Sequence, residues 1–170
     1  VYQGDVQLIV IDSGSTDGSV ELARKMASKT IRIDPGEFHH SRTRNLAVQV
    51  SDLPYVLFIV QDALPGSAHW LDDLVQTALS YGADAVHVRQ VPREGATLFE
   101  RFELLCHDMF MGRELVLQKI PDPQSFEALP YDDAYRRVRL DNVCALYRRE
   151  ALIRMPFPEI DFAEDMAWAL

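Results

Sequence analysis

The sequence has few cysteines, no long apolar run and no excess of positive charge, and each absence excludes a class of protein. Two cysteines among 170 residues, Cys106 and Cys144, are too few for a disulfide framework. Both stand in apolar contexts, which favour buried free thiols in a reducing compartment. No run of about 18 apolar residues and no signal-peptide pattern occur, so this sequence is not expected to span a membrane.

Basic residues are also scarce. The 17 lysines and arginines stand against 26 aspartates and glutamates, which gives a net charge of −9. A nucleic-acid-binding surface needs a basic face, so nucleic acid is not an expected partner. An acidic protein still binds an anionic nucleotide where a metal ion and a few local arginines contact the phosphates. The hydrophobic content of 48% and the charged content of 25% are those of a globular chain.

Apolar strand patterns alternate with amphipathic helix patterns. Strands are expected at residues 8–11, 30–33, 55–60, 85–90 and 142–147, and helices at 19–27, 41–50, 70–81 and 98–109. This alternation predicts an α/β fold with a mostly parallel, doubly wound sheet. Thr97 and Glu100 have the spacing of a capping box. The proline-rich segment 118–139 has no sustained period and is expected to be a long functional loop.

Both ends of the sequence look cut. The first residues are too few for a leading strand and helix, and the last ones begin an amphipathic segment. We therefore expect residues 1–170 to form a single domain that belongs to a longer protein.

The first expected strand is followed by a loop that contains acidic residues and no basic residue. Asp12 follows the apolar residues 8–11, and a small, polar stretch with Gly14 and Asp17 leads into the next helix. A strand, a small-residue loop and a helix start form the usual nucleotide site of an open α/β sheet. This loop lacks the lysine of a simple phosphate cradle. Asp17 directly precedes the helix, so a capping role stands beside a binding role.

Further acids stand where strands end or helices begin. Asp62 follows the strand 55–60 and is expected at the edge where open sheets bind ligands. Its hard oxygen atoms suit Mg²⁺ or Mn²⁺ bridging a diphosphate, and the alternative is a helix cap. Glu164 and Asp165 lie between apolar residues, and partial burial makes a carboxylate a better base. The alternative is an ordinary acidic pair at a helix start.

The main basic cluster, FHHSRTRN, begins an expected helix. Arginines at a helix start are unfavourably placed with respect to the helix dipole, which indicates that they contact something anionic. Arg44 and Asn45 are the favoured binding residues. The alternative is a solvated first turn with Ser41 as its cap. His39 and His40 are adjacent and point in different directions, so a zinc site is not expected.

Four segments in this order resemble the inverting family-2 glycosyltransferases of the glycosyltransferase-A fold, and most of all their rhamnosyltransferase-like branch. The segments are IDSGSTDGS at 11–19, FHHSRTRNLA at 38–47, YVLFIVQDALP at 55–65 and FPEIDFAEDMAW at 157–168. The resemblance implies a Rossmann-like sheet that here lacks the family's first strand. It also implies transfer of a sugar, with inversion, from a dTDP-, UDP- or GDP-sugar to an acceptor hydroxyl in cell-surface polysaccharide or glycan synthesis.

The resemblance also implies roles for individual residues. Asp165 matches the catalytic base, with Glu164 beside it. Asp62 matches the last acid of the family's Asp-x-Asp metal motif, whose first acid is replaced here by Val60. Asp62 is therefore expected to be the one carboxylate ligand of Mg²⁺ or Mn²⁺. The expected nucleotide-binding set comprises Asp12, Ser13, Gly14, Asp17, Arg44, Asn45 and Gln61.

Other functions stand beside this one. A metal-dependent adhesion module needs Asp-x-Ser-x-Ser, but Gly14 and Thr16 occupy the two serine positions. A nucleotidyltransferase has a similar sheet but usually a basic residue in its glycine-rich loop, and residues 12–18 contain none. A non-catalytic nucleotide-sugar-binding relative is a further alternative. The expected acceptor is a glycan or a lipid-linked molecule, chosen partly by the segment 118–139. The expected location is the cytoplasm, at the inner face of the membrane.

Overall fold

The computed structural model describes residues 2–120 and 122–170, so Val1 and Pro121 lie outside the described residues; Pro121 belongs to the segment expected to be a long loop. Strands and helices alternate through most of the chain, which confirms the α/β class. The elements are β1 (Ile9–Asp12), α1 (Ser19–Met26), β2 (Lys29–Arg32), a 3-10 turn (Pro35–Glu37), α2 (His40–Val50), β3 (Tyr55–Ile59), α3 (Trp70–Tyr81), β4 (Ala85–His87), α4 (Leu98–Met111), α5 (Pro123–Glu127), α6 (Tyr131–Val138), β5 (Cys144–Arg148), α7 (Arg149–Arg154) and α8 (Glu164–Trp168).

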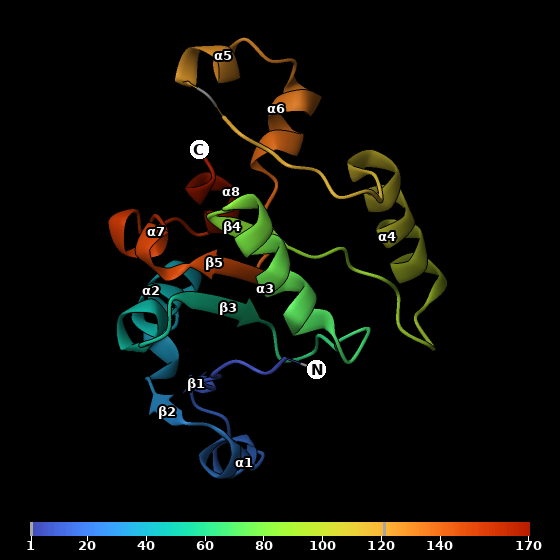
Figure 1. Ribbon diagram of the computed structural model, residues 1–170. Helices are drawn as coiled ribbons and strands as arrows, with labels where there is room; N and C mark the ends of the chain where they lie inside the picture. The colour runs from blue at the N-terminus through green and yellow to red at the C-terminus, as the bar shows by residue number, and fades with distance from the viewer. Residues whose placement is uncertain (1, 121) are drawn as a thin grey trace.

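The strands form two small sheets (Figure 1). β1 and β2 are parallel, as predicted. β5 lies between β3 and β4 and is antiparallel to both, so the prediction of a mostly parallel sheet is wrong for β5. A parallel strand requires a connecting helix that crosses back over the sheet. α4, α5 and α6 lie beside the sheet rather than across one of its faces. The chain therefore enters β5 at the edge where β4 ended, and β5 runs in the opposite direction to β4.

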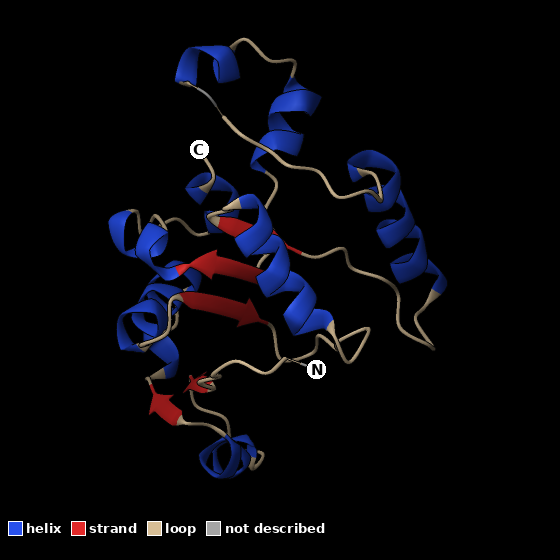
Figure 2. Cartoon of the chain, viewed as in Figure 1, coloured by secondary structure: helices blue, strands red, loops and turns tan. Residues whose placement is uncertain are grey.

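Both faces of the three-stranded sheet are covered, as a doubly wound fold requires (Figure 2). β5 is buried from Cys144 to Tyr147, and its successive side chains point to opposite faces. On one face Leu146 packs with Leu74 and Ala78 of α3. On the other face Tyr147 belongs to a cluster with side chains of α2, α7, α8 and the segment between them, namely Val48, Ala151, Leu152, Phe157 and Trp168.

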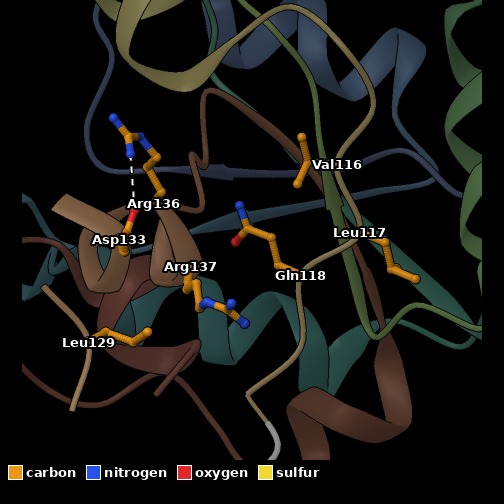
Figure 3. A pocket seen from close by; sticks show the side chains of 7 residues that line it. All are labelled: Val116, Leu117, Gln118, Leu129, Asp133, Arg136 and Arg137. Atoms are coloured by element: carbon orange, nitrogen blue, oxygen red, sulfur yellow. Dashed lines mark hydrogen bonds and ion pairs between the residues drawn. The ribbon is translucent and has the colours of Figure 1, made fainter. Parts of the chain in front are cut away.

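The segment 118–139 is not one long loop, because it contains α5 and α6. Asp122 caps α5 by accepting a hydrogen bond from the N–H of Ser125 at 2.8 Å. The prolines that indicated a loop stand instead at helix starts, with Pro123 as the first residue of α5 and Pro130 directly before α6. A cavity of about 240 Å³ lies here, between residues 116–118 and α6 (Figure 3).

The two cysteines are both free, but they differ in exposure. Cys144 is buried in β5 as predicted, whereas Cys106 is exposed, so the prediction of a buried thiol is wrong there. The reason is that α4 lies at the side of the molecule, away from the sheet. In the part of the chain that the structure describes, we find no helix with the length and apolar character needed to cross a membrane.

Candidate functional site

The ends of β3 and β4 and the start of β5 meet at one edge of the sheet. Ile59, the last residue of β3, lies opposite Cys144, the first residue of β5. Asp62 follows three residues after Ile59, and Asn142 precedes Cys144 by two. The backbone N–H of Asn142 donates to Asp165 Oδ2 at 3.0 Å. The predicted metal ligand and the predicted base therefore lie at the same edge.

Asp12 ends β1 and organises the loop that follows. Its Oδ2 accepts from the N–H of Gly14 at 3.0 Å, and both of its carboxylate oxygens lie 3.2 Å from the N–H of Ser15. Hydrogen bonding to Ser15, and then to Gly14, lowers the pKa of Asp12, and Arg32 adds an attraction at 3.9 Å. The carboxylate is thus held ionised although it is buried. Oδ1, which accepts from the N–H of Ser15, can still accept a further hydrogen bond from a ligand.

Gly14 brings this loop against the turn before α2. Its φ is +106°, and an added Cβ would lie 2.8 Å from Cγ of Pro35. We expect Gly14→Ala to lower the free energy of unfolding by about 1–3 kcal/mol and to weaken nucleotide binding, because the strained backbone and the clash both displace the loop. Urea unfolding and ligand titration measure the two effects. Gly36→Ala is the control, since a Cβ at Gly36 meets nothing within 4 Å. Equal stability of the two variants would contradict the expectation.

Asp17 bonds to the first residue of α1, but Gly18 and not Asp17 occupies the capping position. The Oδ1 of Asp17 accepts from the N–H of Ser19, the first residue of α1, at 3.1 Å, and this bonding lowers the pKa of Asp17. The Asp17 side chain is otherwise exposed, so its part in nucleotide binding stays a prediction. Ser13 is half-buried in the same loop, and Gln61 is exposed in the turn after β3.

Arg44 and Asn45 both contact the C-terminal part of the chain. Arg44 forms an ion pair with Glu164 through Nη1 and Oε1, and burial lowers the pKa of Arg44. Asn45 Nδ2 donates to the carbonyl oxygen of Phe157 at 2.9 Å, and Asn45 Oδ1 accepts from the Phe157 N–H at 3.0 Å. Both residues predicted to bind nucleotide therefore tie α2 to the segment that leads into α8.

Ser41 is not the cap of α2, contrary to the alternative that the sequence left open. The helix begins at His40, with His39 in the capping position and no side-chain cap. Ser41 lies in the first turn and is fully buried, with its Oγ 3.5 Å from the carbonyl oxygen of Ile160. This contact brings the start of α2 against the segment before the acidic pair.

Glu164 and Asp165 begin α8 after a strained residue. Among the residues that the structure describes, Ala163 is the one non-glycine residue with a positive φ, at 59°. Such a backbone costs roughly 1–3 kcal/mol and persists where surrounding contacts impose it. Those contacts are present: the buried Glu164 carboxylate forms an ion pair with Arg44 and accepts a hydrogen bond from Asn142 Nδ2 at 3.4 Å. Asp165 is half-buried beside it.

Asn142 and Tyr147 belong to this site, and the sequence did not reveal them. The Tyr147 hydroxyl donates to Asn142 Oδ1 at 2.9 Å. Burial raises the pKa of Tyr147 far above its usual value, so the phenol stays neutral. In the sequence both residues look like ordinary members of a buried strand, and no motif spacing distinguishes them.

Asp62 has a carboxylate that is available to coordinate a metal ion. Its side chain is exposed, and no hydrogen bond or ion pair with it is found among the described residues. In residues 2–120 and 122–170 no three side chains of His, Cys, Asp or Glu gather as a metal site. Mg²⁺ is often held by one or two carboxylates together with substrate phosphates and waters. The single carboxylate therefore fits a cation whose other ligands come from a bound diphosphate and water.

Comparisons with known proteins show what the chain is similar to. The sequence model of a family described as "Glycosyl transferase family 2" matches residues 2–155. The O-antigen chain rhamnosyltransferase WbaN of Salmonella anatum is 30% identical over 166 residues, and RfbN of Salmonella typhimurium, of the same description, is 39% identical over 170 residues. Each alignment covers 96% of this chain and 50% of the relative, so the chain spans about half the length of these relatives.

A solved structure has the same overall fold. The crystal structure of Staphylococcus aureus TarS, residues 1–349, superposes with a TM-score of 0.57 at 19% sequence identity. The superposition covers 96% of this chain and 44% of the TarS chain. At this identity the likeness concerns the fold alone.

Proposed function

Because the chain belongs to glycosyl transferase family 2, we propose that it forms the donor-binding and catalytic part of an enzyme that transfers a sugar, with inversion, from a nucleotide-diphospho-sugar to an acceptor hydroxyl. Its fold is of the glycosyltransferase-A type. The observation that carries the proposal is the placement of Asp165 and Asp62 at one sheet edge. Inverting transfer needs separate groups for the attacking hydroxyl and for the leaving diphosphate.

In this mechanism Asp165 is the general base. Its half-buried carboxylate accepts the proton of the acceptor hydroxyl while that oxygen attacks the anomeric carbon from the face opposite the leaving group. Asp62 holds Mg²⁺ or Mn²⁺ together with the donor. When bound, the cation supplies positive charge next to the departing diphosphate.

The other predicted residues bind the nucleotide. Asp12 and Asp17 accept hydrogen bonds from the nucleoside, and Ser13, Gly14 and Gln61 line the same pocket. Arg44 and Asn45 lie in the middle of α2, the helix that follows the turn contacting Gly14, and we assign them to the wall of this pocket.

The donor and the acceptor are proposed from the relatives. Two relatives named as O-antigen chain rhamnosyltransferases support a deoxysugar donor such as dTDP-rhamnose and a glycan acceptor. The alternative is a lipid-linked acceptor, which would be met at the cytoplasmic face of a membrane. The cavity between residues 116–118 and α6 has polar and apolar side chains, among them Gln118, Arg137 and Leu129, and is the proposed place for part of the acceptor.

Ligand-dependent thermal stabilisation of the intact protein tests the donor site. We expect a dTDP-sugar with Mn²⁺ to raise Tm more than UDP- or GDP-sugars do, because the ligand that binds the folded protein more tightly stabilises it more. A ligand at about 100 times its Kd adds about 2.7 kcal/mol of stability. Asp62→Ala is expected to lose the Mn²⁺-dependent part of this rise. Asp132→Ala, an exposed aspartate of α6, is the control and keeps it.

Two results would count against the proposal. An Asp62→Ala variant with unchanged Mn²⁺ response would remove Asp62 from the metal site. Stabilisation by nucleoside triphosphates, with no response to any nucleotide-sugar, would favour a nucleotidyltransferase instead.

A further inference from the structure

Asn142 contacts both acids of the site at once. It is 3% exposed and stands just before β5. Its backbone N–H donates to Asp165 Oδ2 at 3.0 Å, and its Nδ2 donates to Glu164 Oε1 at 3.4 Å. Its Oδ1 accepts from the Tyr147 hydroxyl at 2.9 Å. The backbone N–H and both ends of the side-chain amide of this buried residue are thus engaged within the site.

We propose that Asn142 is a positioning residue that holds the Glu164–Asp165 pair in the orientation in which Asp165 receives the acceptor's proton. This inference rests on the proposed function, since it takes Asp165 as the base. It adds a residue that no motif of the sequence indicated.

The orientation of the Asp165 side chain depends on the hydrogen bond that it accepts from the backbone N–H of Asn142. Asp165 also accepts from the N–H of Met166 at 2.9 Å, but Met166 belongs to the same helix. Among the described residues, Asn142 is the one hydrogen-bond donor that reaches the Asp165 carboxylate from another element. It therefore fixes the carboxylate relative to the sheet edge at which Asp62 lies.

The amide of Asn142 has only one satisfactory orientation. The Glu164 carboxylate, paired with Arg44, can only accept hydrogen bonds, so the NH₂ group must face it. The carbonyl oxygen of the amide then faces Tyr147, which is a neutral donor. Asp141 supports the same backbone, because its Oδ1 accepts from the N–H of Val143 at 3.0 Å. A buried network whose members are all satisfied is rigid.

Several other titratable or charged groups face the acidic pair from the surrounding elements. They are His40 and Arg44 of α2, His87 of β4, Arg139 and Asp141 of the segment before β5, and Tyr147 of β5. A substitution at Asn142 removes none of these side chains, although the Tyr147 hydroxyl loses its acceptor.

The test compares Asn142→Asp, Asn142→Ala and Tyr147→Phe in the intact protein, by kcat, donor KM and the pH dependence of kcat/KM. Asn142→Ala keeps the backbone N–H that contacts Asp165 but loses the side-chain bonds to Glu164 and Tyr147, which hold that backbone in place. We expect the backbone donor and the base to shift together and kcat to fall by roughly 10²-fold with donor KM unchanged, because a base displaced by about 1 Å loses that much. Asn142→Asp keeps the shape but places a new carboxylate beside Glu164. The acid limb of its profile is expected to move to higher pH by about one unit, since a nearby like charge disfavours ionisation of the base.

Tyr147→Phe keeps the test decisive if the Asn142 variants do not fold. It removes the hydrogen bond from the Tyr147 hydroxyl to Asn142 Oδ1, and we expect a smaller fall in kcat with the same unchanged KM. Cys144→Ala is the matched control, because Cys144 is buried next to this site but packs on the opposite face of β5. It is expected to lower stability and leave kcat and the pH profile unchanged.

An unmoved acid limb in Asn142→Asp, or an equal loss of kcat in Cys144→Ala, would overturn the positioning role. Turnover retained in Asp165→Asn would contradict the proposed function itself. An inactive Asp165→Asn together with Asn142 and Tyr147 variants of normal kcat would contradict only the inference about Asn142.

Discussion

Asp165→Asn is expected to lower sugar transfer by roughly 10³-fold while leaving donor binding unchanged, because general-base catalysis contributes about 10²–10⁴ to such rates. The substitution keeps the size of the side chain. It also keeps an oxygen that can accept from the N–H of Asn142, so the fold around α8 is not disturbed. What it removes is the group that takes up the proton.

The measurement pairs a transfer assay with calorimetric titration of the donor. Asp161→Asn is the control, because Asp161 lies in the same segment with a fully exposed side chain. It is expected to behave as the unchanged protein does. If Asp165→Asn turned over at a normal rate, another residue would have to be the base.

Arg44→Met is expected to lower the free energy of unfolding by about 3–5 kcal/mol, which is the cost of leaving a buried charge without its partner. Glu164 is 5% exposed, and Arg44 is its one ion-pair partner among the described residues. Methionine fills most of the space of the arginine stem, so lost packing contributes little.

Urea unfolding with two controls separates the charge from other effects. Arg42→Met replaces an exposed arginine of the same helix and is expected to change stability little. The double variant Arg44→Met with Glu164→Gln removes both charges and is expected to recover most of the loss. A double variant no more stable than Arg44→Met alone would show that the ion pair is not what stabilises this contact.

Local patterns in the sequence predicted much of the fold. The predicted helix 70–81 is α3 without a shift, and the predicted capping box at Thr97 and Glu100 is present at the start of α4. The acid-bearing loop follows β1 as expected. These features depend on residues close together in the chain, where periodicity and capping act.

The features that sequence reasoning missed depend on residues far apart in the chain. The direction of β5 follows from where α4, α5 and α6 lie, which no periodicity encodes. The network around Asn142 joins residues 22 positions apart, and the ion pair of Arg44 joins residues 120 apart. The sequence identified Arg44, Glu164 and Asp165 as candidates separately. Only the structure shows that a buried contact links the first two.

The contacts from α2 to the C-terminal segment also set an order of assembly. Arg44 and Asn45 meet partners that lie 120 and 112 residues further along the chain. During synthesis, α2 therefore leaves the ribosome long before Glu164 and Phe157 do. Closing such a long loop is entropically costly and slow, so contacts of this separation form late in folding. We therefore expect the contacts between α2 and the C-terminal segment to form after the more local ones, such as those of Asn142 with Glu164 and Asp165.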